Sequence, residues 1–182
     1  MSFRVLALCG SLRSASSNRG LLAIAQRVSP PELLIEEFAI GDLPFYNADL
    51  DQEGVEPAAV IAFRQRMRDC DAVLIATPEY NGHLPAVLKN AFDWATKPNP
   101  GHALAGKVVT SMASGGGGGG AKALQYLDTV VPFFGNSVVT EPRVELKKGA
   151  EFLAADGTTS NADVEVAIRE RLAALLGALK AR

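Results

Sequence analysis

Apolar residues recur along the chain in short, nearly uninterrupted runs. Five runs rich in Val, Ile, Leu and Ala lie at residues 4–9, 33–39, 72–77, 107–113 and 137–140. Continuous apolar runs of this length are typical of strands in a parallel sheet, because such strands are covered on both faces. The pattern therefore predicts five strands in the interior of the protein.

Between these runs the apolar spacing changes to three or four residues, which is the period of one helix face. Three faces stand out: Leu21, Ile24 and Val28; Leu84, Val87, Leu88, Ala91, Phe92 and Ala95; and Val164, Ile168, Leu172, Leu175, Leu176 and Leu179. Parallel strands need such crossover helices. Ser160 or Asn161 is a suitable cap for the last helix, which closes the fold.

The first apolar run ends in a polar loop, Gly10-Ser11-Leu12-Arg13-Ser14-Ala15-Ser16-Ser17-Asn18. The hydroxyls of Ser11 and Ser17, the guanidinium of Arg13 and a helix N-terminus capped by Asn18 would together bind a phosphate. An ordinary strand-to-helix turn capped by Ser or Asn explains this loop equally well.

Alternating strands and helices indicate an α/β fold with a parallel sheet between two helical layers. A phosphate loop after the first strand favours the flavodoxin-like three-layer sandwich, with a five-stranded parallel sheet in the order 2-1-3-4-5. Neither a repeat nor an interdomain linker interrupts the sequence, so we expect a single domain over residues 1–182.

In such a sheet, ligands bind at the carboxyl ends of the strands. The third strand is followed by Pro78, Glu79, Tyr80 and Asn81, which could present backbone groups and an aromatic surface to a flat heterocycle. A rigid turn before the next helix is the alternative, since proline and glycine are common in loops.

The fourth strand is followed by Ser114 and six consecutive glycines, residues 115–120. Glycine allows a backbone to approach a ring closely, and its freedom would let this loop admit a second substrate. A flexible linker before a helix near Ala121 is the alternative.

Two longer irregular stretches remain. Residues 40–57 form a long connection of the kind that is often functional, and we expect it to line a pocket mouth or a subunit contact. Residues 141–159 are predicted to cross the surface without a chemical role.

Composition narrows the functional classes. The net charge of −2 contains no basic block, which argues against nucleic acid and anionic membranes and in favour of small-molecule partners. Two isolated cysteines, and a start that reads Met-Ser-Phe-Arg without a signal sequence, favour the cytoplasm. The glycine run lacks the Gly-Lys-Ser/Thr of nucleotide hydrolases, and neither histidine has the context of a catalytic triad.

Taken together, the motifs resemble the NADPH-dependent FMN reductase family, a flavodoxin-like group that includes bacterial quinone and chromate reductases. The resemblance covers most of the chain and is carried by Gly10-Ser11-Leu12-Arg13 with Ser17-Asn18, by Thr77-Pro78-Glu79-Tyr80-Asn81, and by Leu88-Lys89-Asn90-Ala91-Phe92-Asp93-Trp94. Leu43-Pro44-Phe45-Tyr46 also fits the family pattern.

The resemblance implies that FMN is tightly but non-covalently bound. Ser11, Arg13, Ser17 and Asn18 would hold its phosphate, and Pro78, Glu79, Tyr80 and Asn81 would lie along the isoalloxazine ring. Ser114, Gly115 and Gly116 would face the other edge of the ring. A structural role in packing and capping is favoured for Lys89, Asn90, Asp93 and Trp94.

We therefore expect a cytoplasmic NAD(P)H-dependent FMN oxidoreductase that passes electrons to quinones or similar acceptors such as chromate, azo compounds or free flavin. Flavin would carry the chemistry, so neither a catalytic side chain nor a metal is expected. A homodimer or homotetramer follows from the resemblance. The alternatives are a flavodoxin-type electron carrier and a cofactor-free binding module on the same fold.

Overall fold

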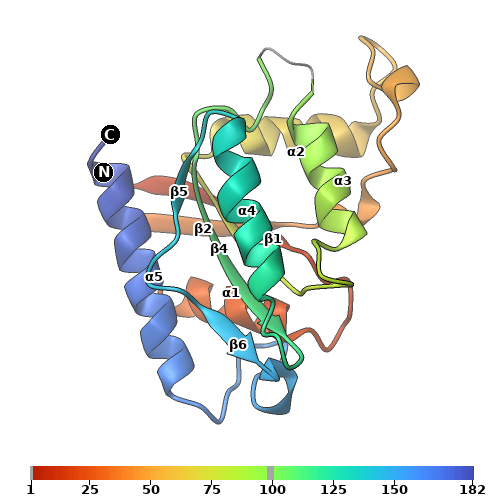
Figure 1. Cartoon of the computed structure of the whole chain (residues 1–182). Coiled ribbons are helices and arrows are strands. Elements are labelled where there is room, and N and C mark those ends of the chain that lie inside the picture. Colours follow the sequence, from red (N-terminus) through yellow and green to blue (C-terminus); the bar gives the residue numbers. More distant parts are fainter. Residues whose placement is uncertain (1, 98–100) are drawn as a thin grey trace.

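The computed structural model describes residues 2–97 and 101–182, so residues 1 and 98–100 of the predicted domain lie outside the described residues. Strands and helices alternate along the chain, as predicted (Figure 1). The strands are β1 (Phe3–Cys9), β2 (Leu33–Phe38), β3 (Ala72–Thr77), β4 (Val108–Gly115), β5 (Ser137–Val139) and β6 (Glu145–Lys147). The α-helices are α1 (Ser17–Val28), α2 (Ala58–Asp69), α3 (Ala86–Ala95), α4 (Ala121–Phe133) and α5 (Asp163–Lys180). Short 3₁₀ helices lie at Ile40–Asp42, Ala48–Leu50 and Gly149–Glu151.

The strands form a parallel sheet in the order β2-β1-β3-β4-β5, which confirms the flavodoxin-like arrangement. Each predicted strand is present, with ends that differ from the expected ones by at most two residues. The apolar runs predicted the strands well because helices cover both faces of the sheet, so most side chains of the central strands β1, β3 and β4 are buried.

The sheet differs from the prediction at its fifth position, which is shared by two short strands. β5 pairs with Val108, Val109 and Thr110 of β4, and β6 pairs with the later residues 113–115. The described residues thus contain six strands, not five, and β6 lies inside the stretch 141–159 that was predicted to be irregular. Strand β6 has three residues, of which only Leu146 is apolar, so it is too short to produce a periodic pattern in the sequence.

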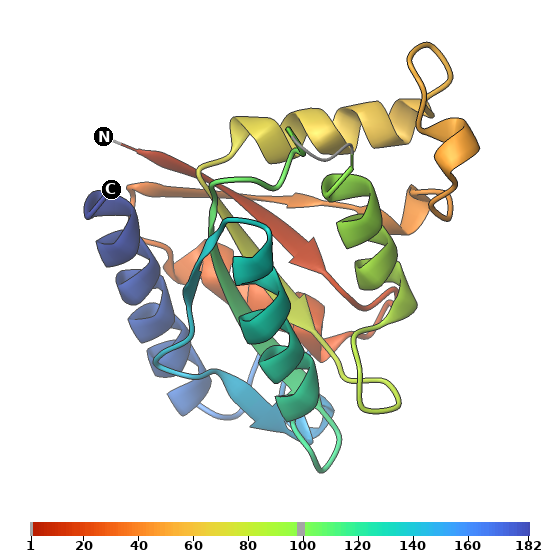
Figure 2. The same ribbon diagram turned by 45° about the horizontal axis from the view of Figure 1, so that its top comes forward.

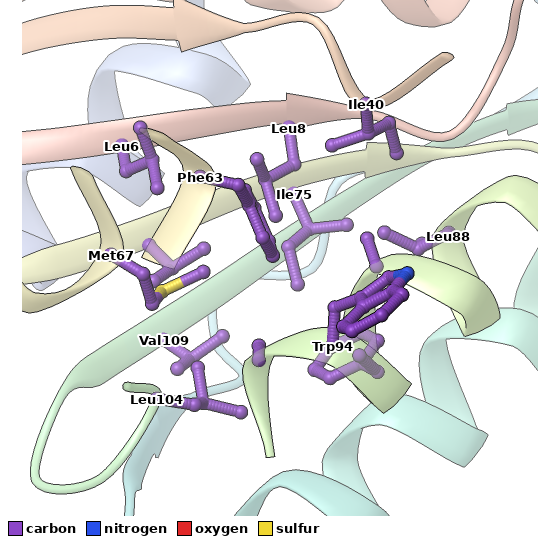
Figure 3. Packing of buried hydrophobic residues seen from close by; sticks show 14 of the residues in the cluster. Leu6, Leu8, Ile40, Phe63, Met67, Ile75, Leu88, Trp94, Leu104 and Val109 are labelled. Carbon is purple, nitrogen blue, oxygen red and sulfur yellow. The ribbon is translucent and has the colours of Figure 1, made fainter. Parts of the chain in front are cut away.

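Alternate side chains of the strands pack into two separate hydrophobic cores, one on each face of the sheet. Leu6, Leu8 and Ile75 point towards α2, α3 and α4 and pack with Phe63 and Trp94 (Figure 3). The intervening strand residues face α1 and α5 on the opposite side of the sheet. Helix α2 did not stand out in the sequence because only Val60, Phe63 and Met67 form its buried apolar stripe and its second half is mainly charged.

The caps of α1 and α5 both differ from the predicted ones. Ser16, not Asn18, is the cap of α1, and its Oγ accepts a hydrogen bond of 3.3 Å from the backbone N–H of Arg19. The prediction of Asn18 as the cap is therefore wrong, because its side chain has a partner elsewhere. At α5 the N-cap position is Ala162, which has no capping side chain, so neither Ser160 nor Asn161 is the cap. Asn161, one residue earlier, still accepts a hydrogen bond of 3.0 Å from the N–H of Asp163.

The long connection 40–57 is fixed to α2 and α3 by buried polar side chains. Arg64 Nη1 lies 2.6 Å from Asp51 Oδ1 and also pairs with Glu56, while its Nε donates to the Trp94 carbonyl at 2.9 Å. Burial opposes the charge of Arg64, but its two carboxylate partners outweigh burial and leave its pKa raised. Hydrogen bonding to Arg64 holds the pKa of Asp51 below its usual range.

The family-motif residues of α3 take part in this anchoring. Asn90 accepts from the N–H of Tyr46 at 2.8 Å and donates to the Pro44 carbonyl at 2.9 Å, and Trp94 Nε1 donates to that same carbonyl at 2.7 Å. Lys89 and Asp93 pair across one helical turn at 2.6 Å. The contacts of Asn90 and Trp94 agree with the packing role that the sequence favoured, whereas Lys89 and Asp93 form a surface ion pair that neither packs nor caps.

Candidate flavin-binding cleft

The loops that follow β1, β3 and β4 come together at the carboxyl ends of the strands (Figure 2). They border a cleft of about 320 Å³. Ten of the eleven sequence-predicted site residues line it: Ser11, Arg13, Ser17, Asn18, Pro78, Glu79, Tyr80, Ser114, Gly115 and Gly116. A larger hollow of about 450 Å³ near Phe3 and the end of α5 contains none of them. Chemistry, not size, therefore identifies the candidate site.

Asn81 is the predicted residue that does not line the cleft. Tyr80 and His83 exchange backbone hydrogen bonds of 3.0 Å in both directions, and Asn81 and Gly82 between them have φ angles of 53° and 76°. Two successive positive φ angles define a type I′ turn, for which Asn-Gly is the preferred pair. The structure therefore gives Asn81 a local reason for its identity.

The first wall of the cleft is the loop 11–16 with the start of α1. Ser11, Ser16 and Ser17 contribute hydroxyl groups, and the first turn of α1 leaves backbone N–H groups without helical partners. Arg13 is exposed at this wall and forms no ion pair with any residue in the described ranges. Hydroxyls, a helix N-terminus and an unpaired guanidinium form an anion-binding environment.

The second wall is the loop after β3, which is docked onto α4. Glu79 Oε2 accepts a 3.0 Å hydrogen bond from the backbone N–H of Lys122 in the first turn of α4. The ring of His83 lies 4.3 Å from that of Tyr126, one turn further along the helix. A carboxylate at a helix N-terminus is stabilised by the macrodipole, so Glu79 holds this loop in place.

The glycine run after β4 forms an ordered turn. The N–H of Gly119 donates to the Gly116 carbonyl at 3.1 Å, and the N–H of Lys148 donates to the same carbonyl at 3.0 Å. Gly120 has a φ of +99°, and a Cβ there would lie 2.6 Å from the Cβ of Ala113. At residues 116–118 a Cβ would meet nothing within 4 Å. Glycine is thus required at the end of the run but not in its middle.

The third wall contains residues that the sequence analysis missed. Lys148, Ala150 and Glu151 line the cleft, although residues 141–159 were predicted to have no chemical role. Pairing of β6 with β4 brings this segment to the site. The sequence offered no strong signal for this segment, because only three residues pair. Their partners lie 32 positions earlier in the chain: Glu145 is opposite Ala113.

A second hollow of about 410 Å³ adjoins the cleft. It is lined by Gly10, Leu12, Arg13, Tyr80, Pro85 and Val87. Arg13 and Tyr80 belong to both linings, so the two spaces share a border. The residues that line the second hollow are more apolar than those of the cleft. One of them, Leu12, is 64% exposed.

Comparison with known proteins identifies the family of the chain. The sequence profile described as NADPH-dependent FMN reductase matches residues 3–151, which include every residue of the cleft. The chain belongs to the NADPH-dependent FMN reductase family. The family prediction, the oxidoreductase class and the use of FMN with NAD(P)H as co-substrate are therefore confirmed.

Curated relatives extend this family assignment over nearly the whole chain. An NAD(P)H-dependent FMN reductase of Pseudomonas aeruginosa is 37% identical, over 94% of this chain and 92% of its own length. An NAD(P)H:quinone oxidoreductase of Solanum tuberosum is 36% identical, over 98% and 91% respectively. A solved structure of the flavoenzyme NAD(P)H:(acceptor) oxidoreductase FerB from Paracoccus denitrificans superposes with a TM-score of 0.86 at 31% identity, covering 98% of both chains.

Proposed function

We propose that this member of the FMN reductase family binds FMN in the cleft between α1, β3 and β4 and uses NAD(P)H to reduce quinones. The observation that carries the proposal is the meeting of ten predicted flavin-site residues in one cleft. They come from three loops that are far apart in the sequence.

The cleft's donor set fits FMN. A phosphate needs N–H and O–H donors and positive charge, which the start of α1, the serines and Arg13 offer. Two carboxylates border the cleft, and both have other partners: Glu79 binds the start of α4, and Glu151 lies 3.8 Å from Lys148 Nζ. Glu79 is thus turned towards α4, and Lys148 places a positive charge beside Glu151.

The remaining walls suit a flat ring. Pro78, Glu79 and Tyr80 present backbone and an aromatic side chain on one side, and Gly115 and Gly116 present backbone without side chains on the other. Backbone N–H and C=O groups can pair with the edge of a heterocycle, and glycine permits close approach.

Bound FMN supplies hydride transfer, so the protein's own residues only need to bind and orient. Arg13 and the serines fix the phosphate end, and the docked loop 78–83 fixes the ring end. Because the flavin supplies the hydride transfer and the protein only binds and orients, such an enzyme needs no catalytic triad.

The adjoining apolar hollow favours a flat aromatic acceptor. Leu12, Pro85 and Val87 provide apolar contacts next to Tyr80, which also borders the flavin cleft. We therefore place quinones ahead of chromate, azo compounds and free flavin among the acceptors. The Solanum relative, named an NAD(P)H:quinone oxidoreductase, is consistent with a quinone acceptor.

Assembly and compartment complete the proposal. Leu12 and Phe45 are 64% and 79% exposed, and burial of such side chains would favour a homodimer or homotetramer. Light scattering, with activity followed on dilution, tests this. Both cysteines are free and buried, which suits the reducing cytoplasm. Among the described helices, none is long and apolar enough to cross a membrane.

Arg13→Ala tests the phosphate end of the site. We expect FMN affinity to fall by roughly 10- to 100-fold, equivalent to about 1.5–3 kcal/mol, with little change for riboflavin, which lacks the phosphate. Arg19→Ala is the matched control, because Arg19 lies on α1 but pairs with Glu37 outside the cleft. Equal losses for both ligands would reject the phosphate assignment.

Absorbance and turnover separate the proposed enzyme from its alternatives. The purified protein should show a flavin spectrum and oxidise NADPH steadily when a quinone is supplied. A yellow protein without NADPH oxidation would indicate an electron carrier. A colourless protein that gains no flavin spectrum with FMN would indicate a binding module.

A further inference from the structure

Asn18 makes an unusual contact for a residue at a phosphate loop. Its side chain is 3% exposed, its Nδ2 donates to the Ser114 carbonyl at 2.8 Å, and its Oδ1 accepts from the Ser114 N–H at 2.9 Å. Both polar atoms of the amide are thus bonded to one residue of β4 that is 96 positions away.

These two bonds replace a missing piece of the sheet. β3 ends at Thr77, which pairs with Ala113, so Ser114 extends one residue beyond the end of its neighbour. The N–H and C=O of one residue in a parallel strand point to the same neighbouring strand. The Asn18 amide occupies the place of the next β3 residue and satisfies both groups of Ser114.

Ser114 is held from two further directions. Its Oγ shares a 2.8 Å hydrogen bond with Ser17 Oγ, and both residues are buried. On the third wall, a Cβ at Gly149 would stand 2.1 Å from Ser114 Oγ, so the backbone there lies directly against the hydroxyl. Ser114 is therefore the point at which the phosphate loop, the glycine run and the segment after β6 are joined.

We propose that Asn18 is a positioning residue that fixes Ser114 and the start of the glycine run against the phosphate loop, and that its side chain is not a phosphate ligand. This inference rests on the proposed function, namely that flavin occupies the cleft. It replaces the phosphate-binding role that the family resemblance implied for this side chain.

The proposal makes a quantitative distinction. A phosphate ligand contributes to FMN binding and nothing to riboflavin binding. A residue that acts through Ser114 shapes the wall next to the ring, so its loss affects both ligands by the same factor. The FMN-to-riboflavin ratio of dissociation constants therefore reports which role Asn18 has.

The test uses the full chain stripped of flavin and titrated with FMN and with riboflavin, followed by flavin fluorescence. For Asn18→Ala we expect both affinities to fall about tenfold, with their ratio unchanged, because two buried backbone groups lose their partners. Arg13→Ala should change the ratio. A loss confined to FMN, or no loss for either ligand, would overturn the proposal.

Asn136→Ala is the control for general destabilisation. Asn136 is also buried and also bonds backbone groups through both ends of its amide, accepting from Lys107 N and donating to the Val131 and Phe134 carbonyls. It lies beyond the opposite end of β4, outside the cleft. We expect lower stability but unchanged flavin affinity. An equal loss of riboflavin binding in this variant would overturn a specific role for Asn18.

A spectroscopic readout and a second variant complete the design. The visible circular dichroism of bound flavin should change in Asn18→Ala but not in Asn136→Ala, and an unchanged signal would count against positioning. If Asn18→Ala does not fold, Asn18→Asp keeps the acceptor for Ser114 N–H but cannot donate to its carbonyl. Its riboflavin affinity should fall, and an unchanged affinity would reject the proposal. Wild-type protein that binds neither flavin would instead reject the proposed function itself.

Discussion

Two irregular connections leave the carboxyl side of the sheet, and they are held in different ways. Residues 40–57, after β2, are fixed by buried side chains of α2 and α3, above all Arg64, Asn90 and Trp94. The glycine run 115–120, after β4, is fixed by backbone hydrogen bonds and by positive φ angles at its end.

The difference separates stability from binding. The side-chain anchors of 40–57 lie in the core around α2 and α3, and that connection does not line the candidate flavin-binding cleft. The glycine run places its backbone directly on the cleft. Changes to the first connection should therefore alter the free energy of unfolding, whereas changes to the second should alter what the cleft does.

The largest effect is expected for Arg64→Met. Asp51, whose side chain is 9% exposed, would lose its partner and remain as a nearly buried charge, which costs about 3 kcal/mol of unfolding free energy. Flavin affinity should not change. Denaturant unfolding and FMN titration measure the two quantities, and a matching loss of FMN affinity would contradict the separation.

The same variant predicts a pH dependence. Arg64 lowers the folded-state pKa of Asp51, so the stabilisation that Asp51 contributes is present above its unfolded pKa and is lost as the pH falls through the lowered folded value. The stability difference between wild type and Arg64→Met should therefore narrow below about pH 4. A stability difference between the two proteins that stays constant from pH 7 to pH 3 would show that the Arg64–Asp51 ion pair is not its source.

A smaller loss is expected for Gly120→Ala. Its φ of +99° disfavours any side chain, and the added Cβ would collide with Ala113. We expect about 2 kcal/mol of destabilisation together with weaker FMN binding, because the turn that carries Gly115 and Gly116 must shift. Chemical denaturation measures the free energy of unfolding, and flavin titration measures FMN affinity. An unchanged free energy of unfolding would mean that the turn relaxes to accommodate the Cβ.

The smallest effect on stability is expected when Gly117 and Gly118 are both replaced by alanine. Neither has a positive φ and neither added Cβ would meet an atom within 4 Å, so stability should stay level or rise by up to about 1 kcal/mol. Stopped-flow bleaching of bound flavin by NADPH gives the functional answer. A slower rate at full flavin occupancy would identify a gate, and an unchanged rate would identify a connecting turn.

Much of this fold could be predicted from local pattern. β1 and β3 are continuous apolar runs because they are buried on both faces, and the polar residues after them mark the site. The first wall of the cleft, where we propose that the phosphate binds, was visible for the same reason, since serines and an arginine directly follow a buried strand.

What the sequence could not show depends on distant partners. Ser16 and Asn18 are both good capping residues, and only Ser114, 96 positions away from Asn18, decides which one caps α1. Likewise, Lys148 reaches the cleft because three residues of β6 find the end of β4. Local spacing carries no information about either pairing.

The split of the fifth strand position also bears on solubility. An exposed sheet edge offers a row of unpaired backbone groups to which a strand of another chain can add, and short, charged edge strands discourage this. β5 and β6 have three residues each, and Glu145 and Lys147 put opposite charges on the second. The interrupted strand thus has the features that discourage strand addition at this edge, and it also brings the third wall to the cleft.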